Sequence, residues 1–240
     1  MSELRVALVA EGPTDSVVIE AALRALLPRP FTLALLQPEP TRPQMGTGWC
    51  GVFKWCRELA ARSPASLEAD PTLPGFDLFV IHLDADVAEK RYPDCGAAVE
   101  AAALAFPALP CSQPCPPAST AADQVRQRLL AWLGIERIGP KTVLCVPSKA
   151  VEAWLAAGVL DASHVLLANV ECDLNLEGRL AALAVAQRIR KTTREYRALA
   201  STVSRQWTAV RSRCTQADRF SLEVAAASGT SPAHPGESPP

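Results

Sequence analysis

Four short apolar segments, separated by segments with helical spacing, constrain the fold of this chain most. They are residues 4–10, 31–36, 77–83 and 141–146. Residues 77–83 are apolar almost without interruption, as strands are when both faces of a parallel sheet are covered. Because strand and helix patterns alternate along the chain, we expect an α/β fold with a mostly parallel, Rossmann-like sheet flanked by helices.

Apolar residues with a period of three to four indicate helices between and after these strands. The pattern predicts helices over residues 14–27, 51–62, 96–106, 120–133 and 147–157, and continuous helix from 176 to about 224. Residues 107–117 contain five prolines and are predicted to be irregular, because proline removes a backbone donor.

The composition is that of a protein with a substantial core, since 49% of the 240 residues are hydrophobic. We expect an α/β domain over residues 1–160, a basic helical region packing on it over 161–225, and a disordered tail over 226–240. No apolar run reaches the roughly 18–20 residues of a membrane span. The first residues also lack the basic and apolar regions of a secretory signal. We therefore expect a cytoplasmic protein that does not bind membranes.

The eight cysteines are expected to be reduced thiols, because disulfides are rare in cytoplasmic proteins. No CxxC pair occurs, and the closest pair is Cys111 and Cys115. That spacing permits a structural zinc site, but a second close pair is absent, which favours ordinary cysteines.

Acidic residues follow three of the predicted strands. Glu11 and Asp15 follow the first, Asp84 and Asp86 follow the third, and Glu152 follows the fourth. The carboxyl ends of parallel strands meet at one edge of the sheet, so these carboxylates are expected to converge there. Such a cluster is repulsive unless a cation neutralises it, and Mg²⁺ or Mn²⁺ takes oxygen ligands of this kind. On an extended strand, Asp84 and Asp86 would point the same way.

Each acidic motif also has a structural interpretation, as a turn or as a helix cap. Lys149 is expected one helical turn before Glu152, where it would balance charge on a phosphate, although a solvated surface lysine fits the pattern equally well. His82 would point with Asp84 on an extended strand, or pack within the sheet. The order of the two motifs, EGPTD and then DAD about 70 residues later, is more specific than either motif alone.

Strand–EGPTD–helix followed by strand–LDAD resembles the TOPRIM domain of topoisomerases, primases, OLD-type nucleases and RecR-like proteins. The resemblance implies that Glu11, Asp84 and Asp86 bind Mg²⁺ or Mn²⁺ and act on nucleic-acid phosphodiesters. It also matches Asp15 to the second acid of the turn in OLD-like members. The function that it implies is a metal-dependent nuclease acting on DNA or RNA.

The segment VPSKAVEAW, residues 146–154, resembles the DUF4276 group of TOPRIM-like proteins and matches Glu152 to a third acidic position. The resemblance covers about residues 4–160 and implies a stand-alone protein of phage-defence or mobile-element neighbourhoods. The chain lacks the phosphate-binding GxxxxGK[ST] motif, so an ATPase partner would be a separate chain. Neither tyrosine lies in a recognisable nucleophile context, which argues against a topoisomerase.

Basic residues are concentrated late in the chain. Residues 176–220 contain ten Lys or Arg and three acidic residues, a net charge of +7, whereas the whole chain carries −1. Arg190, Arg194 and Arg197 have helical spacing, and Lys191 flanks them. Such a face next to a metal site would bind the phosphates of a nucleic acid. A merely solvated face is the alternative.

Three other functions remain open from the sequence. The segment around Asp84 fits the DxD box of haloacid-dehalogenase phosphatases, in which the first Asp is the nucleophile. A sugar-nucleotide transferase would use the same DxD to bind Mn²⁺. Both leave Glu11 and Asp15 without a role. A catalytically silent TOPRIM-like module that binds a partner is the third alternative.

Overall fold

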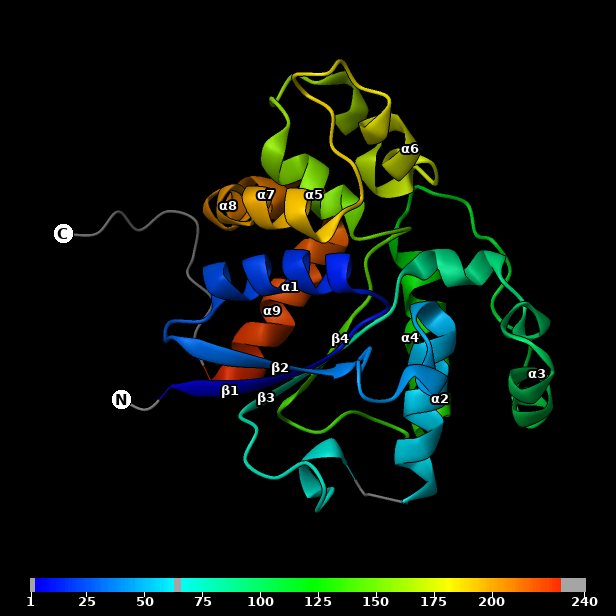
Figure 1. Ribbon diagram of the computed structural model, residues 1–240. Helices are drawn as coiled ribbons and strands as arrows, with labels where there is room; N and C mark the ends of the chain where they lie inside the picture. The colour runs from blue at the N-terminus through cyan, green and yellow to red at the C-terminus, as the bar shows by residue number, and fades with distance from the viewer. Residues whose placement is uncertain (1–2, 63–65, 230–240) are drawn as a thin grey trace.

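The computed structural model describes residues 3–62 and 66–229, and Figure 1 shows the arrangement of their helices and strands. A four-stranded, all-parallel sheet with the order β2-β1-β3-β4 lies at the centre. The strands are β1 (Leu4–Val9), β2 (Phe31–Gln37), β3 (Leu78–His82) and β4 (Thr142–Cys145). The expected α/β fold with a parallel sheet is confirmed, and all four strands lie where the apolar segments predict them.

Both faces of the sheet are covered, which explains why its strands are apolar at successive positions. In β1, Val6 and Leu8 face one hydrophobic core, and Ala7 and Val9 face the other. All four side chains are at most 1% exposed. The alternation follows from the two-residue period of a strand.

Helices form the two outer layers of the described chain (Figure 1). Helices α1, α5, α7, α8 and α9 contribute to the core on one face, and α2 and α4 to the core on the other. The helix bounds are α1 (Pro13–Leu26), α2 (Gly48–Ala61), α3 (Ala97–Ala103), α4 (Ser119–Leu133), α5 (Glu152–Val159), α6 (Leu176–Ala181), α7 (Thr193–Arg205), α8 (Trp207–Arg213) and α9 (Thr215–Ser228).

The strand order creates a topological switch point between β1 and β3. The chain leaves β1 through α1 to reach β2 on one side, and leaves β3 through α4 to reach β4 on the other. The loops at the carboxyl ends of these two neighbouring strands therefore diverge. Open α/β sheets bind ligands in the crevice that such divergence creates. The acidic motifs at Glu11 and Asp84 lie in these two loops.

The late helices differ from the expectation in their boundaries. The segment from 176 to 224 is broken into four helices, with an irregular stretch between α6 and α7. The helix after β4 begins at Glu152, so residues 147–149 are not helical. Helix α9 includes residues 226–228 of the expected tail and ends before Gly229, whose φ of 69° suits a glycine. The rest of the tail, 230–240, lies outside the described residues.

Four of the eight cysteines form disulfides, so the expectation of reduced thiols is wrong for them. Cys50 pairs with Cys95, and Cys115 pairs with Cys172. A zinc site that uses Cys95 or Cys115 is incompatible with these bonds. Cys111 is free and exposed. Sequence spacing does not reveal such pairs, because 45 and 57 residues separate the partners.

None of the helices in residues 3–62 and 66–229 has the length and apolar character needed to cross a membrane.

Candidate metal centre

The loops after β1 and β3 meet at the switch point through a direct hydrogen bond. The backbone N–H of Asp84 donates to Glu11 Oε1 over 2.7 Å. His82, the last residue of β3, places Nε2 3.0 Å from Asp84 Oδ1. One ligand atom from each of Glu11, His82 and Asp84 lies within 4.8 Å of the other two. These three residues form the primary cluster, which is compact enough for a single metal ion.

The loop after β4 fixes the position of Asp84. The backbone N–H of Val151, just before α5, donates to Asp84 Oδ1 over 3.0 Å. Backbone hydrogen bonds also join the loop after β3 to the loop after β4: Leu83 to Cys145, Ala85 to Pro147, and Asp86 to Lys149. Asp84 is thus held by the loops of three strands and is 7% exposed.

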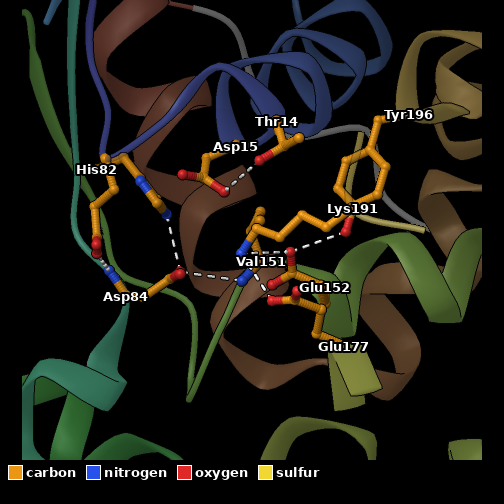
Figure 2. A network of polar contacts seen from close by, with 10 residues as sticks. Thr14, Asp15, His82, Asp84, Val151, Glu152, Glu177, Lys191 and Tyr196 are labelled. Atoms are coloured by element: carbon orange, nitrogen blue, oxygen red, sulfur yellow. Dashed lines mark hydrogen bonds and ion pairs between the residues drawn. The ribbon is translucent and has the colours of Figure 1, made fainter. Parts of the chain in front are cut away.

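A second group of polar side chains lies beside the primary cluster (Figure 2). Glu152, the first residue of α5, is 1% exposed. Its Oε1 accepts a 2.9 Å hydrogen bond from the hydroxyl of Tyr196 and lies 3.0 Å from Lys191 Nζ. Lys191 Nζ is also 3.3 Å from Glu177 Oε2. Asp15, in the first turn of α1, points toward the same space and is buried.

Two of the expected site residues lie differently from the prediction. Asp84 precedes a 3-10 helix over Ala85–Glu89, so the two Asp side chains are not on an extended strand. Asp86 pairs with Lys90 over 3.5 Å and is 36% exposed in its side chain. Lys149 precedes α5 instead of lying in it, and its Nζ is 3.5 Å from Glu89 Oε1. The structure therefore directs Lys149 to Glu89 and not to the primary cluster.

Crowding and burial disfavour the charged forms of these acids. Burial raises the pKa of the Glu11 carboxyl well above its ordinary value, and the negative charge of Asp84 raises it further. Burial also raises the pKa of Asp84, to which Asp15 and Glu152 add. The pKa values of Asp15 and Asp86 are raised as well, chiefly by burial. A bound cation would remove this cost, because opposite charge favours the carboxylate form.

Lys191 places a positive charge beside Glu152 and Asp15. Burial lowers the pKa of its ammonium, but the carboxylates of Glu152 and Asp15 outweigh that effect, so the pKa is above its ordinary value. The pKa of Tyr196 is also raised, first by burial and then by the charge of Glu152. Tyr196 therefore remains a hydroxyl donor to Glu152.

Two buried atoms support the fit of a metal ion. Glu152 Oε2 and His82 Nδ1 have no hydrogen-bond partner among residues 3–62 and 66–229, although both side chains are at most 1% exposed. Buried polar atoms are normally satisfied, so an unpaired carboxylate oxygen beside other carboxylates points to a missing cationic or hydrated partner. Carboxylate oxygens with one imidazole nitrogen suit a first-row ion such as Mn²⁺, whereas Mg²⁺ prefers oxygen ligands. The donor set therefore fits a divalent ion.

The basic residues expected to bind nucleic acid are separated by the structure. Arg194 and Arg197 are exposed on α7. Arg190 lies before α7, so it does not share a helical face with them, and Lys191 turns toward Glu152. Arg190 instead lines a cavity of about 500 Å³ at the far end of α5. This cavity is roughly 10 Å along the helix from Glu152.

Tyr196 and Glu177 contact the site residues although no sequence pattern predicts it, and the position of His82 fits two interpretations from the sequence. A buried tyrosine usually hydrogen-bonds a polar partner, but the sequence does not say which one. His82 lies two residues before Asp84, and this spacing on a strand was the available indication. Compared with protein-family models, with curated proteins and with solved structures, the chain matches none.

Proposed function

We propose that this protein is a TOPRIM-like, metal-dependent nuclease that hydrolyses phosphodiester bonds of DNA or RNA. One observation carries the proposal: Glu11, His82 and Asp84 come together at the switch point of the sheet, with Asp15 and Glu152 beside them. Ligands of open α/β sheets bind at this place. The raised pKa values of the acids support a cation as the partner that completes the cluster.

In this proposal Glu11, His82 and Asp84 hold Mn²⁺ or Mg²⁺. The ion would polarise a phosphoryl oxygen and lower the pKa of a bound water. Asp15 adds negative charge that strengthens the attraction of the site for a cation. Asp86 is partly exposed, so a substrate or a water molecule can reach its carboxylate.

A polyanionic substrate is supported by the charge of the late helices. Residues 176–220 carry a net charge of +7. Arg194 and Arg197 are exposed on the helix whose Tyr196 hydroxyl contacts Glu152. Both arginines lie within two residues of Tyr196, on α7, the helix that contacts the site through Tyr196. Exposed guanidinium groups bind phosphates and release counterions.

The test is a cleavage assay on single-stranded and duplex DNA and on RNA, with Mn²⁺ or Mg²⁺. We expect the wild type to cleave one of these substrates, EDTA to stop cleavage, and Asp84→Asn to abolish it. Glu100→Gln is the matched control, because it neutralises an exposed carboxylate on α3. Equal cleavage by the wild type and Asp84→Asn would overturn the proposal. Turnover of a small phosphoester with an aspartyl-phosphate on Asp84 would instead indicate the phosphatase.

A silent binding module is the second candidate, and one observation favours it. Lys191 already pairs with Glu152, so part of the negative charge is neutralised without a metal. In that case the protein would bind nucleic acid or a protein partner without turnover, and Asp84→Asn would leave the complex unchanged. The same assay, combined with a gel-shift measurement, separates the two candidates.

A further inference from the structure

Lys191 does not belong to the part of the chain that forms the sheet. It lies between α6 and α7, immediately before the residue that caps α7. Thr192 Oγ1 accepts from the N–H of Glu195 over 3.2 Å, and Glu195 Oε2 accepts from the N–H of Arg190 over 2.6 Å. These two bonds fix the backbone on both sides of Lys191. The side chain of Lys191 therefore extends to Glu152 and Glu177 from a backbone that hydrogen bonds hold in place.

The ammonium of Lys191 lies where a second cation would be expected. Asp15 and Glu152 both raise the pKa of Asp84, and the charge of Lys191 acts on both of them. Its Nζ is 3.0 Å from Glu152 Oε1 and 3.3 Å from Glu177 Oε2. Two-metal sites place their ions about 3.5–4 Å apart between shared carboxylates. An ammonium and a divalent ion on the same oxygen would repel each other strongly at that range.

The two oxygens of Glu152 have different surroundings. Oε1 accepts from Tyr196 and pairs with Lys191, whereas Oε2 has no partner in the part of the chain that the structure describes. Glu152 is almost fully buried, and Figure 2 shows its carboxylate facing the space that it shares with Asp84 and Lys191. One oxygen is therefore committed to the lysine and the tyrosine, whereas the other is buried without a hydrogen bond to any described residue.

We propose that Lys191 supplies the second positive charge of this site, so that one divalent ion binds per chain, at Glu11, His82 and Asp84. The inference rests on the proposed function in assuming that the primary cluster binds a metal. It adds that a lysine of this chain, and not a second ion, offsets part of the negative charge of the adjoining acids, Asp15 and Glu152.

The experiment measures how many Mn²⁺ ions bind per chain, by calorimetric titration of the whole protein and by electron paramagnetic resonance. We expect about one ion for the wild type, with the spectrum of an isolated Mn²⁺. Lys191→Met should bind about two ions, with spin coupling between them, because it vacates the space beside Glu152. Arg194→Met is the matched control, since it removes a positive charge from the surface three residues away, and it should bind one.

Lys191→Arg keeps the positive charge and should still bind one ion. Comparison of its fold with that of Lys191→Met shows whether loss of the charge or misfolding changes the number of ions. Two ions in the wild type, or one in a folded Lys191→Met, would overturn this inference and leave the nuclease proposal standing. No Mn²⁺ bound to the wild type would overturn both, because the primary cluster would not be a metal site. The readout is the number of bound ions, so it does not depend on cleavage.

Discussion

Glu11 accepts its 2.7 Å hydrogen bond from the peptide N–H of Asp84, not from a side chain. The bond joins the loops after β1 and β3. It holds the carboxylate of Glu11 beside Asp84, whose negative charge raises the pKa of Glu11. A peptide N–H cannot be removed by changing the side chain of residue 84. Substitutions of Asp84 therefore test its charge while this connection between the loops remains.

Asp84→Asn should weaken Mn²⁺ binding by at least about 10–100-fold, because that range is typical of residues that only support a metal ligand and Asp84 is a proposed ligand. The amide oxygen can still accept from Val151, whose N–H donates to Asp84 Oδ1 in the wild type. The variant should therefore fold. Differential scanning fluorimetry measures the effect, because an ion present at 100 times its Kd stabilises a protein by about 2.7 kcal/mol.

The melting temperatures of the wild type and of Asp84→Asn are compared first without metal and then with Mn²⁺. Without metal, Asp84→Asn should melt at the same or a higher temperature, because it removes a buried charge that Asp15 and Glu152 oppose. With Mn²⁺, the wild type should gain more stability than the variant. A wild type whose melting temperature is insensitive to Mn²⁺ would contradict the assignment of the metal site.

The stability of the metal-free protein should fall as pH rises through the range in which the cluster ionises. The ordinary pKa values are 4.5 for Glu11 and 3.8 for Asp84, and both are raised well above these in the folded protein. Between the unfolded and folded pKa values the folded state binds more protons, so its stability decreases with pH. Their contribution is greatest below about pH 4 and is lost above the folded pKa values.

Urea unfolding in EDTA from pH 4 to pH 8 measures this dependence. Other acids titrate in the opposite sense, such as Asp70, whose pKa is lowered by hydrogen bonds from Thr72 and Arg62 despite its burial. The useful quantity is therefore the difference between the wild type and Asp84→Asn. The free energy of unfolding of Asp84→Asn should exceed that of the wild type by an amount that grows with pH. Added Mn²⁺ should reduce this excess. A difference that is constant across this range would argue against the raised pKa values.

Tyr196→Phe should lower the free energy of unfolding by about 1–3 kcal/mol, because it removes a donor to a buried carboxylate. Tyr92→Phe is a suitable control, since its hydroxyl accepts from Trp132 Nε1 over 3.1 Å in the opposite core. Both variants should lose stability in urea unfolding. Only Tyr196→Phe should also change Mn²⁺ binding, since only this hydroxyl contacts Glu152.

The denatured protein should show about four reactive thiols without reductant and eight after reduction, as the two disulfides require. In the native protein, Cys111 alone is exposed among the free cysteines and should react first. Breaking either disulfide should cost about 2–4 kcal/mol, because each closes a long loop in the unfolded chain. Thiol titration and peptide mapping check the pairing, and eight thiols without reductant would refute it.

The order of the elements was predictable because the strands are apolar at successive positions, most clearly β3 and β4, whose residues are all buried. Val6, Ala7, Leu8 and Val9 illustrate this, with alternate side chains in different cores. The meeting of the loops that carry Glu11 and Asp84 was also predictable, since parallel strands end at one edge of the sheet. Neither step needed contacts between distant residues.

The position of Lys191 was not predictable from the same patterns. It is one of ten basic residues in 176–220, and nothing local distinguishes it from Arg190 or Arg194. Its place beside Glu152 depends on how α7 packs on α1 and α5, which is a long-range property. The 3-10 helix after Asp84 escaped prediction for a related reason, since it depends on hydrogen bonds to the loop after β4.

The core on the α1 face is built jointly by the early strands and by the last helices. Val6 of β1 and Ile19 of α1 belong to the same cluster as Tyr196, Trp207 and other residues of the late helices. A truncated chain that stops at residue 160 would leave this apolar surface in water and would also lose the lysine and tyrosine that contact Glu152. In the described residues the sheet and the late helices therefore share one core, and we expect the sheet to be unstable when it is separated from these helices.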